Sequence, residues 1–80
     1  MAEKIEVYGT TWCSDCRRAK DLMDTYGIEY NWTNIEEDPY SQNLVKEINS
    51  GKSIVPTIVF PDGSILVEPS NIELIRKLDL

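Results

Sequence analysis

The pattern of hydrophobic and polar residues changes several times along the chain, and each change predicts a different element. Short runs rich in β-branched and aromatic residues, some of them alternating with polar ones, predict strands. The predicted strands are residues 4–8, 28–35, 57–60 and 65–67. In the second of these, Ile28, Tyr30 and Trp32 are expected to share one face. The last two are separated by the turn sequence Pro-Asp-Gly-Ser and therefore predict a β-hairpin.

Between the strands, apolar residues recur at the spacing i, i+3, i+4, i+7, which is typical of one face of a helix. The predicted helices are residues 14–26, 38–48 and 70–78. Gly27 and Gly51 mark the ends of the first two, and Ser70 caps the third. The residues expected to be buried on these faces are Ala19, Leu22, Met23 and Tyr26 in the first helix, Leu44, Val45 and Ile48 in the second, and Ile72, Leu74, Ile75 and Leu78 in the third.

The element order is therefore βαβαββα, in an α/β chain with a single predicted domain over residues 1–80. The first strand, helix and second strand suit a right-handed parallel unit, and the hairpin adds antiparallel strands. A mixed sheet flanked by three helices is expected.

Composition narrows the range of partners. The formal net charge is −6, which disfavours nucleic acid or an anionic membrane as a partner, because those surfaces require clustered Lys and Arg. No apolar run approaches the roughly 18 residues that would cross a membrane. The N-terminal sequence MAEKIEVYGT lacks the apolar stretch of a signal peptide. We expect a cytoplasmic monomer.

The two cysteines, Cys13 and Cys16, lie in the sequence TTWCSDC, and the chain has no histidine. A structural zinc site normally takes four Cys or His ligands, so we expect no metal site within one chain. A site shared between two chains, each giving both cysteines to a metal or an iron–sulfur cluster, is the alternative function.

The spacing and position of the cysteines favour a reactive dithiol. Cys13 falls at the start of the first predicted helix, where unpaired N–H groups and the helix dipole stabilise a thiolate. Cys16 follows one turn later, where it can attack a mixed disulfide formed on Cys13 and release the product. Trp12, directly before the nucleophile, is expected to offer an apolar contact to a docking partner.

Three charged neighbours are expected to tune the ionisation of the Cys13 thiol. Asp15, between the cysteines, should oppose a second negative charge nearby. Arg17 and Arg18 should offset this effect in part, because they place positive charge close to the thiolate.

These residues resemble the glutaredoxin family. The sequence VYGTTWCSDCRRAKDLMDTYGIEY is similar to the family's first strand, dithiol motif, helix and second strand, and SIVPTIVF is similar to the segment before its hairpin. The resemblance implies a thioredoxin-like fold with strand order 2-1-3-4 and a cis peptide bond between Val55 and Pro56 that faces the cysteines. It also implies that the backbone of Val55 pairs with an incoming thiol peptide, as an added strand would.

Several positions depart from glutaredoxins that use glutathione. Many of those proteins have Lys where this chain has Thr10, and Gly-Gly where it has Leu66-Val67. The stretch VPTIVFPDGSILVEPS is instead similar to mycoredoxins and other actinobacterial glutaredoxin-like proteins, whose carrier is mycothiol or another small thiol. The helix start at Ser70 and Asn71 is a candidate anion site.

The predicted function is that of a thiol-disulfide oxidoreductase acting on protein disulfides or on mixed disulfides of proteins with a small thiol. Cys13 attacks and Cys16 resolves. No organic cofactor or iron–sulfur cluster is expected. The electron donor would be mycothiol, glutathione, another small thiol, or an enzyme similar to thioredoxin reductase.

Overall fold

The computed structural model describes residues 4–80, so the expectation about the N-terminal sequence falls partly outside the described residues. The strands are β1 (Ile5–Gly9), β2 (Tyr30–Asn34), β3 (Thr57–Val59) and β4 (Ile65–Val67). The helices are α1 (Ser14–Thr25), α2 (Pro39–Ile48), α3 (Asn71–Leu78) and the short 3₁₀ helix η1 (Ile35–Glu37). All seven predicted elements are present, and η1 is an addition.

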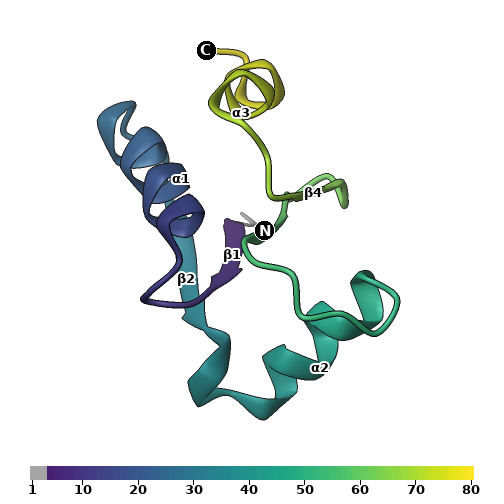
Figure 1. Cartoon of the computed structure of the whole chain (residues 1–80). Helices are drawn as coiled ribbons and strands as arrows, with labels where there is room; N and C mark the ends of the chain where they lie inside the picture. The colour runs from purple at the N-terminus through teal and green to yellow at the C-terminus, as the bar shows by residue number, and fades with distance from the viewer. Residues whose placement is uncertain (1–3) are drawn as a thin grey trace.

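The strands form one mixed sheet in the order β2-β1-β3-β4, as the resemblance implied. β1 pairs in parallel with β2 and antiparallel with β3, which forms the hairpin with β4. In Figure 1, α1 and α3 lie above the strands and α2 lies below them. The fold is thioredoxin-like, and it places the turn between β1 and α1 at one end of the central strand.

The hydrophobic core lies between the sheet and the helices α1 and α3. The inward residues of β1 alternate with half-buried ones, as its sequence pattern predicts. The core cluster consists of Ile5, Val7, Ala19, Met23, Ile58, Phe60 and Leu74. Tyr30 and Trp32 of β2 pack against this cluster, as expected of residues on one face, and Ile28, which precedes the strand, packs against it too.

Three predictions about elements and burial were wrong. Tyr26 is 52% exposed, because α1 ends at Thr25 and Tyr26 is its C-cap. Ile72 is 62% exposed, because it lies in the first turn of α3, where only Leu74 is fully buried. The second strand is shorter than expected, since Ile35 begins η1 with Asn34 as the cap.

Candidate active site

Cys13 is the N-cap residue of α1. Its backbone is extended, with φ −84° and ψ 116°, and its Sγ accepts a hydrogen bond from the backbone N–H of Cys16 at 3.2 Å. The cap position is normally filled by Ser, Thr, Asp or Asn, whose oxygen satisfies an unpaired N–H of the first turn. A thiol at this position faces the positive end of the helix, so its thiolate gains an N–H donor and a favourable dipole.

Cys16 lies one turn further along and is fully buried. Burial raises the pKa of its thiol to about 12, and hydrogen bonding with Cys13 and the negative charge of a Cys13 thiolate act in the same direction. The backbone of Thr10 and the charge of Lys20 act against this shift. The dithiol therefore pairs one accessible sulfur with one that keeps its proton.

We expect iodoacetamide to modify only Cys13 in the reduced, folded protein between about pH 7 and about pH 9. The pKa of the Cys16 thiol is about 12, well above this range of pH, so nearly all of the Cys16 thiol keeps its proton. Peptide mass spectrometry of samples quenched over time measures the two sites separately. Alkylation of Cys16 at a rate similar to Cys13 would contradict the assignment, and unfolding in urea should make both sites reactive.

Cys16 fits against the sheet because position 9 has no side chain. A Cβ built on Gly9 would lie 2.4 Å from Cys16 Sγ and 2.8 Å from the ring of Trp32. Lys20 lies over the same ring, with its Nζ 3.6 Å from the ring centroid. The absence of a side chain at Gly9 thus leaves the space that the Cys16 sulfur and the Trp32 ring occupy.

The segment before β3 closes the site from the opposite side. The Val55-Pro56 peptide bond is cis, as the resemblance implied, and the carbonyl oxygen of Val55 lies 3.9 Å from Cys13 Sγ, which donates to it. A groove of about 450 Å³ runs between this segment and the start of α1. Its lining is Trp12, Cys13, Ser14, Asp15, Ser53, Ile54, Val55 and Glu68.

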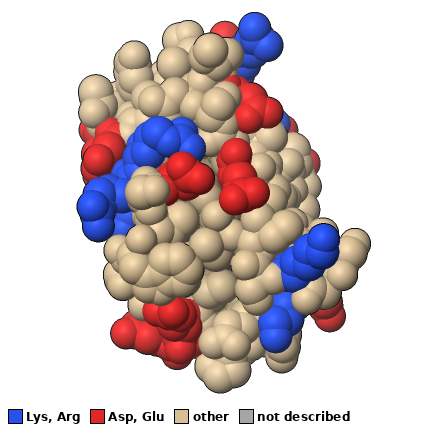
Figure 2. All heavy atoms as spheres, in the orientation of Figure 1, with Lys and Arg blue, Asp and Glu red and all other residues tan. Residues whose placement is uncertain are grey.

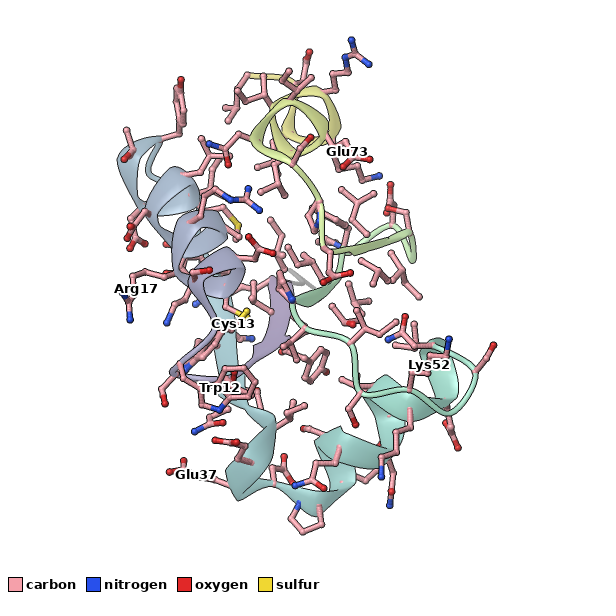
Figure 3. The ribbon with its side chains drawn as sticks, viewed as in Figure 1. Trp12, Cys13, Arg17, Glu37, Lys52 and Glu73 are labelled. Atoms are coloured by element: carbon pink, nitrogen blue, oxygen red, sulfur yellow. The ribbon has the colours of Figure 1, made fainter. Side chains whose placement is uncertain are left out.

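Trp12 stands at the rim of this groove and is 69% exposed. Its Nε1 donates a hydrogen bond to Oε2 of Glu36 in η1, at 2.9 Å. Figure 3 shows the ring beside Cys13 and on the side toward η1. Next to the groove is a second hollow of about 250 Å³, lined by Thr10, Trp12, Ile35, Glu36, Gln42, Ser53 and Val55. Trp12, Ser53 and Val55 line both hollows, which therefore adjoin, and Cys13 lines only the larger one.

Asp15, Arg17 and Arg18, which were predicted to affect the ionisation of Cys13, have different surroundings. Arg18 pairs with Asp15 at 3.3 Å and also donates to Asn71 Oδ1 at 2.8 Å and to the carbonyl of Pro69 at 3.1 Å. It therefore ties the first turn of α1 to the start of α3 and partly neutralises Asp15. Arg17 is exposed and points outward from α1, away from α3, in Figure 3.

The start of α3 is capped by its own residues. Ser70 Oγ accepts from the N–H of Glu73 at 3.1 Å, and the N–H of Ser70 donates to Oε1 of Glu73 at 2.8 Å. This is a capping box, and it satisfies two of the N–H groups that an incoming anion would use. Ser70 therefore caps α3, and Asn71 accepts a hydrogen bond from Arg18 of α1.

Sequence reasoning did not identify three residues that line the site: Glu36, Glu68 and, as a buried polar group, Thr10. Thr10 is 4% exposed, and its hydroxyl has no hydrogen-bond partner within residues 4–80. The Ser-x-x-Glu pattern at Ser70 was visible in the sequence and signals a capping box. Nothing local marked Glu36 or Glu68, since both reach the site through tertiary packing.

No cluster of three or more His, Cys, Asp or Glu that could hold a metal ion occurs within residues 4–80. Over the same residues, no helix is long and apolar enough to cross a membrane.

Three features define the class of protein: the sheet order 2-1-3-4, the Cys-x-x-Cys pair at the turn from β1 to α1, and the cis-proline segment opposite the first cysteine. The class is that of thiol oxidoreductases with a thioredoxin-like fold.

Comparison with known proteins identifies the family within this class. The glutaredoxin family model matches residues 5–65, and the chain belongs to the glutaredoxin family. It is 36% identical over 74 residues to Rv3198A of Mycobacterium tuberculosis, a protein named for the same family, covering 92% of this chain and 88% of that one. It is 33% identical over 75 residues to Mycoredoxin 1 of Corynebacterium glutamicum, covering 94% and 92%.

Solved structures support the fold independently. A mutant of the thioredoxin-like protein BC3987 superimposes with a TM-score of 0.83 at 24% identity, covering 98% of this chain and 97% of that one. A glutaredoxin from Archaeoglobus fulgidus gives a TM-score of 0.75 at 18% identity, covering 94% and 85%. The similarity in fold thus extends over nearly the whole chain.

Proposed function

We propose that the protein reduces disulfides of proteins, or mixed disulfides of proteins with a small thiol, through a two-step exchange at Cys13 and Cys16. The observation that carries the proposal is the arrangement of the two sulfurs. Cys13 caps the helix at the floor of an open groove, while Cys16 is buried and donates its backbone N–H to the Cys13 sulfur at 3.2 Å.

In the first step, the Cys13 thiolate attacks one sulfur of the substrate disulfide. A bond forms between Cys13 Sγ and that sulfur, the substrate S–S bond breaks, and the other sulfur leaves as a thiolate. The N–H of Cys16 stabilises the attacking charge before the step. The backbone of Val55 lies beside Cys13, and we expect it to pair with an extended segment of a protein substrate.

In the second step, Cys16 loses its proton and attacks Cys13 Sγ. The Cys13–Cys16 disulfide forms, the bound thiol leaves with the bonding electron pair, and a proton goes to the leaving thiolate. The substrate has then gained two electrons and the protein has lost two. The negative charge on Cys13, which helps to raise the Cys16 pKa, is gone once the mixed disulfide exists. Cys16 therefore becomes easier to ionise at the moment when it must attack.

For the return of the oxidised protein to the dithiol, the proposed donor is mycothiol or another small thiol, or an enzyme similar to thioredoxin reductase, with glutathione a weak donor. Three observations support this. Thr10 supplies no cation at the site, Leu66-Val67 occupies β4 where a Gly-Gly pair would allow close approach, and Mycoredoxin 1 is 33% identical over nearly all of the chain.

We expect mycothiol to support turnover of a protein mixed disulfide at least about tenfold faster than glutathione at equal thiolate concentration, a difference of about 1.4 kcal/mol in the transition state. The assay measures release of the free protein thiol with each small thiol, or with a thioredoxin reductase and NADPH, as the reductant. The Cys13→Ser variant is the control for uncatalysed exchange. Turnover with glutathione that equals or exceeds the other reductants would contradict the proposed donor and leave the oxidoreductase activity in place.

A further inference from the structure

Acidic side chains line the groove at the reactive sulfur and the hollow that adjoins it, and neither lining contains a cation. Asp15 and Glu68 line the groove that contains Cys13, and Glu36 lines the hollow that adjoins it. Neither lining contains Lys or Arg. Figure 2 shows red patches between α1 and α3 and at the lower left of this face, with blue patches along α1 and at the lower right.

The three carboxylates are not equivalent. Asp15 is paired with Arg18, which reduces its effect on an incoming group. Glu68 is exposed, and Glu36 accepts only a neutral hydrogen bond, from Trp12. Within residues 4–80, neither Glu36 nor Glu68 has a cation within ion-pair distance. Neither carboxylate therefore has an ion-pair partner that would offset its charge toward a group entering the hollow that it lines.

A second observation independently points to a ligand in the smaller hollow. Thr10 lines that hollow, is only 4% exposed and leaves its hydroxyl without a partner within the described residues. An unpaired buried hydroxyl is costly unless a partner arrives, and a hydroxyl can donate to a neutral carbonyl or accept from an amide. It cannot supply the charge that a carboxylate would need in order to enter an acidic hollow.

We infer that the groove selects its disulfide by charge, favouring substrates with an uncharged or cationic group beside the attacked sulfur and rejecting those with a carboxylate there. The unpaired carboxylates of Glu36 and Glu68 supply the repulsion, and Thr10 supplies a hydrogen bond to an amide of the substrate. The inference rests on the proposed exchange at Cys13. The step itself is unchanged: Cys13 forms a disulfide with one half of the substrate and the other half leaves as a thiolate.

The test compares three symmetrical disulfides of cysteine derivatives: N-acetylcysteine, which is anionic, N-acetylcysteinamide, which is uncharged, and cysteinamide, which is cationic. The Cys16→Ser variant stops the reaction at the mixed disulfide, so the rate of the first step is read by mass spectrometry. Each rate is divided by that of dithiothreitol with the same disulfide, which removes differences between leaving groups.

We expect the anionic disulfide to react about tenfold more slowly than the uncharged one. Glu36→Gln and Glu68→Gln, each in the Cys16→Ser background, should each raise the rate with the anionic disulfide about threefold relative to the uncharged one. One unit charge a few ångströms away in a solvated groove has an effect of about that size. Glu47→Gln, an exposed glutamate on α2 away from both hollows, is the matched control and should recover nothing. High salt should reduce the discrimination.

Thr10→Val keeps the shape of the side chain and removes the hydroxyl. It should slow all three disulfides about threefold, since all three carry an amide. Equal normalised rates for the three charges in the parent protein, or equal recovery by Glu47→Gln, would overturn the selection by charge. An unchanged rate in Thr10→Val would show that the Thr10 hydroxyl does not contribute to binding of the substrate. If none of the three disulfides formed an adduct on Cys13, the proposed exchange itself would fail.

Discussion

Replacing Cys13 with serine should lower the rate of disulfide reduction by at least about three orders of magnitude. A serine hydroxyl is a weak nucleophile at neutral pH and cannot form the mixed disulfide through which the exchange proceeds. Cys16→Ser should behave differently, since Cys13 keeps its cap position and its N–H donor from residue 16. That variant should carry out the first attack and then accumulate as the mixed disulfide.

The measurement is reduction of a protein mixed disulfide, followed by intact-mass analysis under denaturing conditions. The two variants are controls for one another, because each removes one sulfur of the only cysteine pair in the chain. Full activity in Cys13→Ser, or a stable adduct on Cys16 in that variant, would show that the roles are reversed. Circular dichroism of both variants checks that the fold is retained.

The second large effect is expected for Gly9→Ala, at a position that never touches the substrate. The new Cβ would lie 2.4 Å from Cys16 Sγ and 2.8 Å from the Trp32 ring, so one or both must move. Extra carbon forced into a packed interior typically costs about 1–3 kcal/mol. We expect a loss of about 2 kcal/mol in the free energy of unfolding of the reduced protein. Displacement of Cys16 should also slow the resolving step, so that mixed disulfide accumulates in the variant.

A double-mutant cycle separates this contact from other effects of the alanine. The free energy of unfolding in urea is measured for Gly9→Ala in the parent protein and in the Cys16→Ala variant, which lacks the sulfur. The cost of Gly9→Ala should fall by about 1 kcal/mol in the second background, as is typical for residues in direct contact. An equal cost in both backgrounds would show that Cys16 is not the group displaced by the new Cβ.

Elements whose signals lie among neighbouring residues were predicted well. The helix start at Cys13 follows from the strand, the turn and the apolar spacing that begins at Ala19, and each of these is local. The cap at Ser70 is equally local, since its partner Glu73 is three residues away. Errors occurred at element ends: Tyr26 continues the apolar spacing of α1, but the chain turns at Gly27, so its ring remains exposed.

Side-chain partners far apart in sequence were predicted poorly. Arg18 was expected to offset the charge of Asp15, with which it pairs, but its contacts with the start of α3 were not predicted. In the structure it spans to Asn71 and to the carbonyl of Pro69, 53 and 51 residues away. Glu36 reaches Trp12 across 24 residues, and no motif marks either residue for that contact. The cis bond at Val55-Pro56 was expected from the resemblance to the family, and the structure contains it.

By itself, the sequence determined the order of the elements, the position of the dithiol at a helix start and the roles open to its two sulfurs. Those properties depend on spacing and on backbone groups within one turn of the chain. Only the tertiary structure decided what surrounds the sulfurs: the burial of Cys16 under Gly9 and Trp32, the acidic lining with Glu36 and Glu68, and the unpaired hydroxyl of Thr10. These features depend on how the sheet and helices pack, because packing brings together residues that are far apart in the sequence and whose contacts no local pattern signals.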